Sequence, residues 1–168
     1  RIRGEYETSV LSTLVDVVSE NTTFWEIGAK RGYFSLSLAP LVRDVVAVDA
    51  TKRDLEALEE ASVRNGYNNI LTHHTLLQEG ADLDEIVDLY GVPDVALMDI
   101  EGWEEAVLQG ADEFLAAKPT MVIEVHDDQQ VSHTLEAAGY CVAKIKQRRL
   151  NNYHLVALPE NDVNSAVN

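Results

Sequence analysis

Short runs of β-branched and apolar residues alternate with amphipathic stretches along most of the chain. Buried strands are predicted at 23–27, 45–48, 69–74, 94–100 and 120–126, and helices at 10–18, 33–42, 53–66, 82–91, 103–116 and 129–139. Strands that alternate with helices are joined by right-handed crossovers, which produce a parallel sheet with helices on both faces. The pattern therefore predicts an α/β fold.

The two strand-like segments at 140–145 and 152–158 depart from this alternation. No helix fits between them, so they are predicted to pair antiparallel as a hairpin around a basic loop. The whole chain is then a Rossmann-like sheet of seven strands, mostly parallel, with an antiparallel C-terminal hairpin. Its 168 residues have room for one core. We predict a single domain over 1–168, with 1–22 as an N-terminal helical cap and 140–158 as the hairpin.

The stretch "FWEIGAKRGYFS" joins the first predicted strand to the helix after it. Gly28 and Gly32 would let this turn approach a ligand, and the following helix would point free N–H groups at it. A dinucleotide loop has a glycine between these two, and this loop lacks it. Glu26 would repel a pyrophosphate but would suit the cationic sulfonium of S-adenosylmethionine. The alternative is a tight turn without a ligand.

A second acid, Asp49, ends the second predicted strand about twenty residues beyond the glycine loop. A carboxylate at this position can accept hydrogen bonds from both ribose hydroxyls of an adenosine. Alternatively, Asp49 or Thr51 caps the helix that follows. The loop and Asp49 together favour nucleoside binding.

The segment from 93 to 127 resembles the FkbM-type family of S-adenosylmethionine-dependent methyltransferases. Members carry a strand ending in Asp-x-Glu-Gly, a Glu-containing helix, a glycine, a proline and a strand ending in Glu-x-His. "GEYE" (4–7) and the glycine loop also match the family's opening pattern. Asp49 is followed by Ala50 and Thr51, without the family's common proline, and the third strand offers no clear acid or amide for the adenine. The matching residues in the later segment are Asp99, Glu101, Gly102, Glu104, Gly110, Pro119, Glu124 and His126.

The resemblance implies roles for two groups of residues. One group would form the cofactor pocket, with Glu7 closing over it. The other would face the methyl group and the acceptor, with His126 as general base and Asp99 orienting the reactants. The alternative for the second group is a solvated acidic rim, against which Gly102 argues because a bare residue suggests a close approach. The pocket group is Glu26, Gly28, Ala29, Gly32, Asp49, Ala50 and Asp99, and the acceptor group is Asp99, Glu101, Glu124 and His126.

The chain has 29 acidic and 13 basic residues, for a formal net charge of −16. This charge repels nucleic-acid phosphates and anionic membranes, so a nucleic-acid substrate is disfavoured. The acids are spread along the chain, as in proteins of a high-salt cytoplasm and also in ordinary acidic enzymes.

The single cysteine, Cys141, excludes an internal disulfide and fits a reducing compartment, so we expect a cytoplasmic protein. Its strand-like surroundings predict a small buried side chain. Neither the histidines nor the acids are predicted to bind a metal ion, and no apolar run is long enough to span a membrane.

The resemblance implies a methyltransferase that acts on a hydroxyl of a small molecule, a saccharide or a lipid-linked glycan. Two alternatives stay open. One is a nicotinamide-dependent oxidoreductase, which the missing loop glycine disfavours. The other is a non-catalytic domain that binds an adenosine cofactor, because fold does not determine function.

Overall fold

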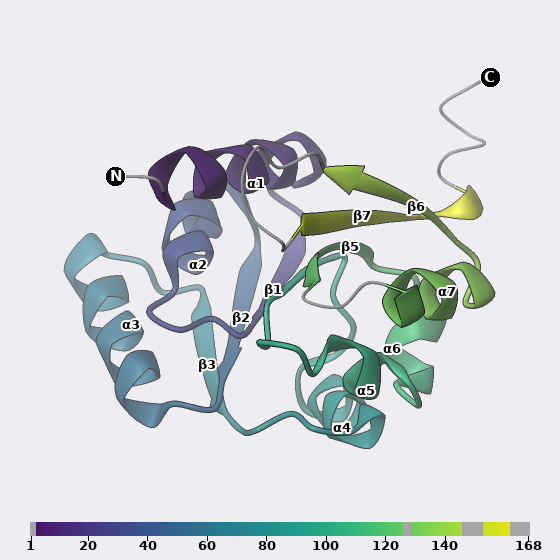
Figure 1. The fold of residues 1–168 in the computed structure, drawn as a ribbon. Coiled ribbons are helices and arrows are strands. Elements are labelled where there is room, and N and C mark those ends of the chain that lie inside the picture. Colours follow the sequence, from purple (N-terminus) through teal and green to yellow (C-terminus); the bar gives the residue numbers. More distant parts are fainter. Residues whose placement is uncertain (1–2, 126–128, 146–152, 162–168) are drawn as a thin grey trace. The chain divides into compact units, whose positions relative to one another are not determined.

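A computed structural model describes residues 3–125, 129–145 and 153–161. The strands are β1 (Thr23–Ile27), β2 (Asp44–Asp49), β3 (Ile70–His74), β4 (Val95–Met98), β5 (Thr120–Val125), β6 (Tyr140–Ile145) and β7 (Tyr153–Pro159). They form one seven-stranded sheet in the order β3-β2-β1-β4-β5-β7-β6 (Figure 1). The predicted seven-stranded, mostly parallel sheet with an antiparallel C-terminal hairpin is confirmed.

The chain divides into two compact units. The first unit is Arg1–Leu76 with Val95–Leu97, and the second is Leu77–Asp94 with Met98–Asn168. The single domain expected over 1–168 stays a prediction. The helices of the first unit are α1 (Arg3–Val17), α2 (Tyr33–Leu38), the 3-10 helix η1 (Ala39–Leu41) and α3 (Lys52–Asn65). Those of the second unit are α4 (Gly80–Tyr90), α5 (Glu104–Leu108), α6 (Asp112–Ala116) and α7 (Gln129–Ala137).

The first unit is built on three parallel strands, with β2 between β1 and β3. All five residues of β1 are buried, as its apolar composition predicts. α3 lies against β2 and β3 (Figure 1). It buries Leu55, Leu58 and Ser62, the face that its sequence period predicts. α3 ends at Gly66, whose φ of 74° is the left-handed conformation that favours glycine at this position.

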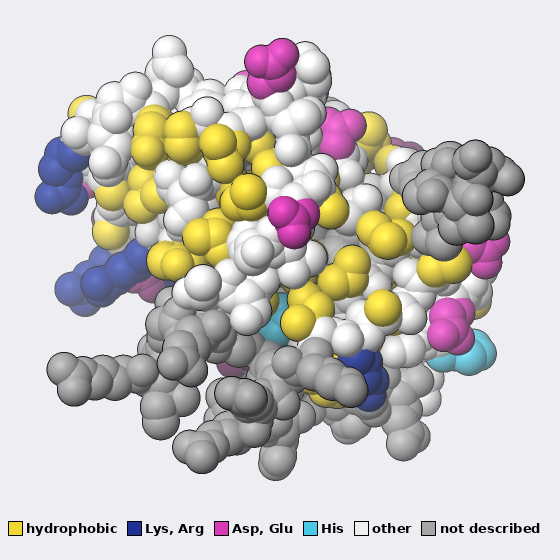
Figure 2. Space-filling view, turned by 90° about the horizontal axis from the view of Figure 1, so that it is seen from above, with side chains coloured by type: hydrophobic (Ala, Val, Ile, Leu, Met, Phe, Trp, Pro, Cys, Tyr) yellow, Lys and Arg dark blue, Asp and Glu magenta, His cyan; other side chains and the backbone are white. Residues whose placement is uncertain are grey.

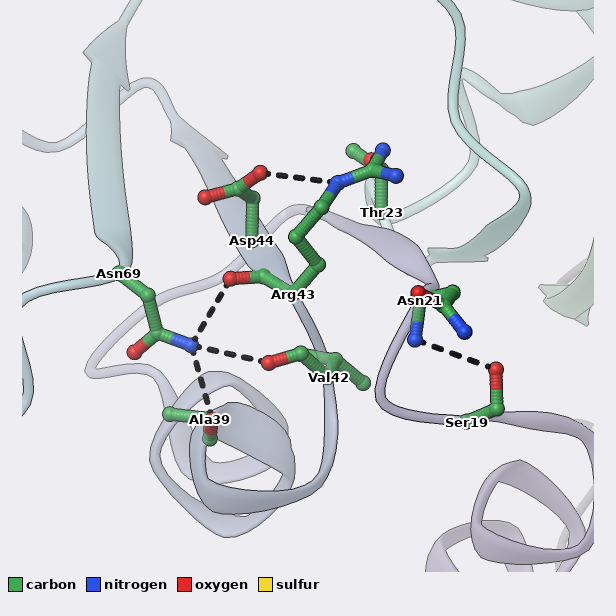
Figure 3. A network of polar contacts seen from close by, with 8 residues as sticks. All are labelled: Ser19, Asn21, Thr23, Ala39, Val42, Arg43, Asp44 and Asn69. Carbon is green, nitrogen blue, oxygen red and sulfur yellow. Dashed lines mark hydrogen bonds and ion pairs between the residues drawn. The ribbon is translucent and has the colours of Figure 1, made fainter.

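A polar network ties together the segments that lead into the strands of the first unit. Figure 3 shows the Asn69 side-chain amide donating to the carbonyls of Ala39, Val42 and Arg43, at 2.8, 3.2 and 3.3 Å. The Arg43 guanidinium in turn contacts Asp44 at 3.2 Å and also bonds the hydroxyl of Thr23. One amide therefore joins the start of β3 to the turn before β2.

In the second unit, α4 packs against two short helices, α5 and α6. The helix expected over 103–116 is two helices, which lie on either side of Gly110. Asp84 of α4 accepts hydrogen bonds from the backbone N–H groups of Glu113 and Phe114, at 3.1 and 3.0 Å. These bonds satisfy the amino end of α6 and hold it on α4.

The C-terminal strands pair antiparallel, as predicted, but the second strand of the hairpin lies inside the sheet. β7 pairs with β5 on one side and with β6 on the other. The prediction of a buried Cys141 is wrong, because that side chain is exposed. β6 ends the sheet, and Cys141 points to the face opposite its buried neighbour Tyr140. The basic loop between the two strands lies outside the described residues.

Acidic and apolar side chains are intermixed on the surface. On the face drawn in Figure 2, the Asp and Glu side chains lie apart from one another, between apolar ones. The most exposed of the large apolar side chains are Val63 and Leu89, at 78% and 65% exposure. Within the part of the chain that the structure describes, no helix is long and apolar enough to cross a membrane.

Candidate functional site

The loop after β1 is fastened to the end of β2. The backbone N–H groups of Gly28 and Ala29 both donate to the Val48 carbonyl, each at 2.9 Å. Gly28 has a φ of 87° and Lys30 a φ of 51°. A lysine in this left-handed region is uncommon. Such a conformation is kept when the surroundings enforce it, as they often do at ligand sites.

Glu26 holds the amino end of α2. It is 3% exposed, and its carboxylate accepts hydrogen bonds from the backbone N–H of Phe34 at 3.3 Å and of Ser35 at 2.7 Å. The Ser35 hydroxyl also donates to it. A carboxylate at this place satisfies N–H groups that have no partner within the helix and interacts favourably with the helix dipole. Glu26 thus determines the position of the loop between β1 and α2.

Gly32 and Ala29 have packing reasons for their small size. A Cβ atom on Gly32 would overlap the side chain of Leu58, and its φ of 70° also favours glycine. Ala29 lies in a buried cluster with Ala47 and the same Leu58. These two small residues let the loop and α3 approach each other, a role that the sequence alone did not distinguish from contact with a ligand.

Asp49 connects the two loops of the first unit. One carboxylate oxygen accepts a hydrogen bond from the Lys30 N–H, and the other accepts one from the Thr51 N–H, each at 2.7 Å. Asp49 is 8% exposed. A carboxylate has about four acceptor positions, so two backbone bonds leave capacity for the hydroxyls of a ribose. Thr51 occupies the N-cap position of α3, but no described side chain caps that helix, and the Asp49 bond orders only the residue before it.

The end of β3 adds a residue that sequence reasoning did not select. Asp49 and His74 are partners in the β2–β3 register. An imidazole nitrogen of His74 lies 3.1 Å from the carbonyl oxygen of Ala50, and the N–H of Thr75 donates to the Asp49 carbonyl at 3.1 Å. Ala50 itself is exposed. The only signal in the sequence was the position of His74 at a strand end.

In the second unit, the turn after β4 adopts an unusual conformation. Glu101 and Gly102 both have positive φ, at 57° and 100°. Glu104 is 2% exposed, and one oxygen of its carboxylate accepts hydrogen bonds from Ile100 N–H at 3.2 Å and from Gly102 N–H at 3.1 Å. The buried Glu104 thus braces a turn that carries half-buried Asp99 and exposed Glu101.

Gly102 is explained by backbone conformation. No atom of the described residues would lie within 4 Å of a Cβ atom at this position, so crowding does not require a glycine. Its φ of 100° does require it. Backbone conformation therefore accounts for Gly102 without a ligand, and the left-handed Glu101 beside it is the better indicator of a functional site.

Glu124 lies one residue before the end of β5, and β7 brings His154 directly opposite it in the register. Glu124 is half-buried and His154 is 3% exposed. Burial lowers the pKa of His154 to about 4, because charging the ring would remove a cation from water. The two residues are thirty positions apart and no sequence pattern connects them, so only strand pairing brings them together.

We expect His154 to make stability depend on pH. Its folded pKa of about 4 lies below the usual unfolded value of about 6.5. Unfolding therefore takes up a proton as the pH falls from 6.5 to 4, and this group's contribution to stability falls by about 3 kcal/mol in that window. In urea unfolding, the free energy of unfolding of the parent protein should fall by this amount relative to that of His154→Gln as the pH falls from 6.5 to 4. The control His133→Gln, at an exposed position, should show no such trend.

Two of the predicted site residues cannot be placed. His126 lies outside the described residues, and Glu7 lies in α1 with no described side chain. Among residues 3–125, 129–145 and 153–161, no group of three His, Cys, Asp or Glu side chains could hold a metal ion.

A family model describes most of the same region. The model of the FkbM methyltransferase domain matches residues 28–142, which include the loop after β1, the end of β2 and the turn after β4. The chain belongs to the FkbM methyltransferase domain family. No curated protein matches the chain.

Solved structures share the fold of this FkbM domain. One is a precorrin-6y C5,15-methyltransferase from Geobacter metallireducens, at 18% identity and a TM-score of 0.69, with 89% of this chain and 88% of that chain covered. Another is an rRNA methylase from Streptococcus thermophilus, at 14% identity and a TM-score of 0.66, with 90% and 94% covered. A third is a SAM-dependent methyltransferase from Aquifex aeolicus, at 13% identity and a TM-score of 0.63, with 88% of each covered.

The FkbM domain is a methyltransferase whose cofactor is S-adenosylmethionine. Asp49 keeps acceptor capacity beyond its two backbone bonds, which suits the ribose hydroxyls of that cofactor. The family match also decides against the nicotinamide-dependent alternative.

Proposed function

We propose that this FkbM domain transfers a methyl group to a hydroxyl of a small molecule, a saccharide or a glycan. The observation that carries the proposal is the braced turn after β4, where a buried Glu104 supports Asp99 and a strained Glu101. A hydroxyl is a weak nucleophile until its proton is removed, so a site rich in proton acceptors suits O-methylation.

The proposal assigns the cofactor to the first unit. Asp49 accepts hydrogen bonds from the ribose hydroxyls, and the loop at Gly28 and Ala29 lies along the cofactor. Glu26 and Gly32 hold that loop in place through α2 and α3. Ala50 contributes its exposed backbone, and Glu7 closes over the pocket. When bound, S-adenosylmethionine supplies an electrophilic methyl group, and the residues of the chain provide position and electrostatics.

The proposal assigns the acceptor to residues of the second unit. Asp99 orients the reactants, and His126, two residues beyond Glu124, removes the acceptor proton. Glu101 and Glu124 accept hydrogen bonds from the acceptor's hydroxyls. A polyhydroxylated acceptor matches this set, because carboxylates accept several O–H donors at once.

A nucleic-acid acceptor remains the less favoured class. The rRNA methylase from Streptococcus thermophilus shows that the fold serves RNA. The formal net charge of −16, however, repels a phosphate backbone, which supplies most of the affinity in such complexes.

The cofactor assignment is tested by calorimetric titration with S-adenosylhomocysteine and NAD in parallel. We expect S-adenosylhomocysteine to bind and NAD not to bind. Asp49→Ala should weaken binding by about 1.5–3 kcal/mol, the cost of losing a charge-assisted hydrogen bond. The matched control is Asp54→Ala, which removes a carboxylate of α3 that pairs with Arg31 at 3.1 Å on the surface. Equal affinity in the two variants would refute the ribose assignment.

The acceptor is found by incubating the protein with cell extract and S-adenosylmethionine that carries a labelled methyl group. Label that survives alkaline treatment and appears in hydroxyl-bearing small molecules or glycans supports O-methylation. Label found only in nucleic acid would refute the proposed acceptor class and identify nucleic acid as the acceptor.

A further inference from the structure

The sheet of the second unit has one polar row at the end of β5. Glu124 of β5 is opposite His154 of β7, and His154 is opposite Ile145 of β6. The next row on the same face is Val122, Val156 and Ala143, all apolar. A glutamate and a histidine thus lie next to an apolar row on the same face, at the strand end where the acceptor is proposed to bind.

Register brings the two polar side chains within reach of each other. Residues directly opposite in an antiparallel pair point to the same face, with Cβ atoms about 4.5–5.5 Å apart. An imidazole N–H can bridge that separation to a carboxylate oxygen. The opposite neighbour on β6, Ile145, offers His154 no charge and no acceptor side chain.

Burial determines the protonation state of His154 opposite the Glu124 carboxylate. His154 is 3% exposed, and a cation at this depth would lose most of its hydration, so burial lowers its pKa to about 4 even with a carboxylate opposite. The ring is therefore neutral near pH 7, with one N–H to donate and one nitrogen to accept. An apolar side chain would fill the same space without this desolvation, so stability alone does not explain a histidine at this position.

We propose that His154 is a positioning residue for Glu124. Its neutral imidazole donates an N–H hydrogen bond to the Glu124 carboxylate and fixes the direction in which that carboxylate meets the hydroxyl groups of the acceptor. The inference rests on the proposed function, in which Glu124 contacts the acceptor. A hydrogen bond from a fixed second residue keeps a site residue in one rotamer, as supporting residues do in preorganised sites.

The pairing is tested without any acceptor by NMR of protein labelled with ¹⁵N at histidine. One fixed tautomer gives His154 two widely separated ring-nitrogen signals, and these should persist at pH 5.5, where an imidazole in water is mostly protonated. Glu124→Gln should move the His154 signals and leave those of His133 in place. Unchanged His154 signals in Glu124→Gln would overturn the proposal.

The positioning role is tested with two substitutions and a labelled-methyl assay on the acceptor fraction from cell extract. His154→Leu fills the space but has no donor, whereas His154→Gln keeps an N–H. We expect His154→Leu to lower kcat by about 10–100-fold, the range for loss of a supporting hydrogen bond, with the KM for S-adenosylmethionine unchanged. His154→Gln should recover most of that loss, and His133→Gln should match the parent.

The double variant separates positioning from packing. If His154 acts through Glu124, adding His154→Leu to Glu124→Gln should lower kcat no further. Additive losses, or equal losses in His154→Leu and His154→Gln, would assign His154 a packing role and overturn the proposal. A parent protein that transfers no methyl group would instead refute the proposed function, while the NMR result would still decide whether the pair exists.

Discussion

Replacing His126 with alanine is expected to lower methyl transfer by about 10²–10⁴-fold, the usual contribution of a general base. An imidazole has an ordinary pKa near 6.5 and accepts a proton readily at neutral pH. The affinity for S-adenosylhomocysteine should stay nearly unchanged, because the cofactor is assigned to the first unit. Turnover with the acceptor fraction and calorimetry with S-adenosylhomocysteine measure the two effects separately.

The control for this prediction is His133→Ala, which removes an exposed imidazole from α7 seven residues further along the chain. Its turnover should equal that of the parent. Near-normal turnover in His126→Ala would show that His126 is not the general base and belongs to a solvated acidic rim. Asp99 and Glu101 would then be the next candidates for the base, because the turn that carries them is held by Glu104.

Replacing Glu26 with alanine is expected to lower the free energy of unfolding by about 2–4 kcal/mol. The substitution leaves the N–H groups of Phe34 and Ser35 without their carboxylate, in a place where Glu26 is 3% exposed. The same change frees the amino end of α2, so the loop after β1 loses its fixed position. The affinity for S-adenosylhomocysteine should fall at least about tenfold.

Urea unfolding and calorimetry of Glu26→Ala and Glu26→Gln measure these effects. The amide keeps one acceptor oxygen, so Glu26→Gln should lie between the parent and the alanine variant. Glu79→Ala is the matched control, since Glu79 also caps a helix, α4, but is exposed. It should lose about 1 kcal/mol and keep its affinity. Parental affinity in Glu26→Ala would show that the loop does not hold the cofactor.

The candidate site was predictable where a role depends on local sequence. Glu26 lies one residue before the end of buried β1 and Asp49 ends its parallel neighbour β2, so their position at adjacent strand ends of the first unit follows from the order of elements. What each carboxylate bonds could not be predicted. Asp49 bonds Lys30, and Glu104 bonds the turn before its own helix, through side-chain geometry that no sequence period encodes.

The elements and the fold class were predictable, because apolar periodicity and helix stops such as Gly66 act over a few residues. The contacts between distant segments were not predictable from such local signals. The tertiary structure placed β7 between β5 and β6, which exposed Cys141 at the end of the sheet and set His154 opposite Glu124. The physical reason is that strand order depends on which faces and edges are buried together. That choice is made by the whole core and not by any one segment.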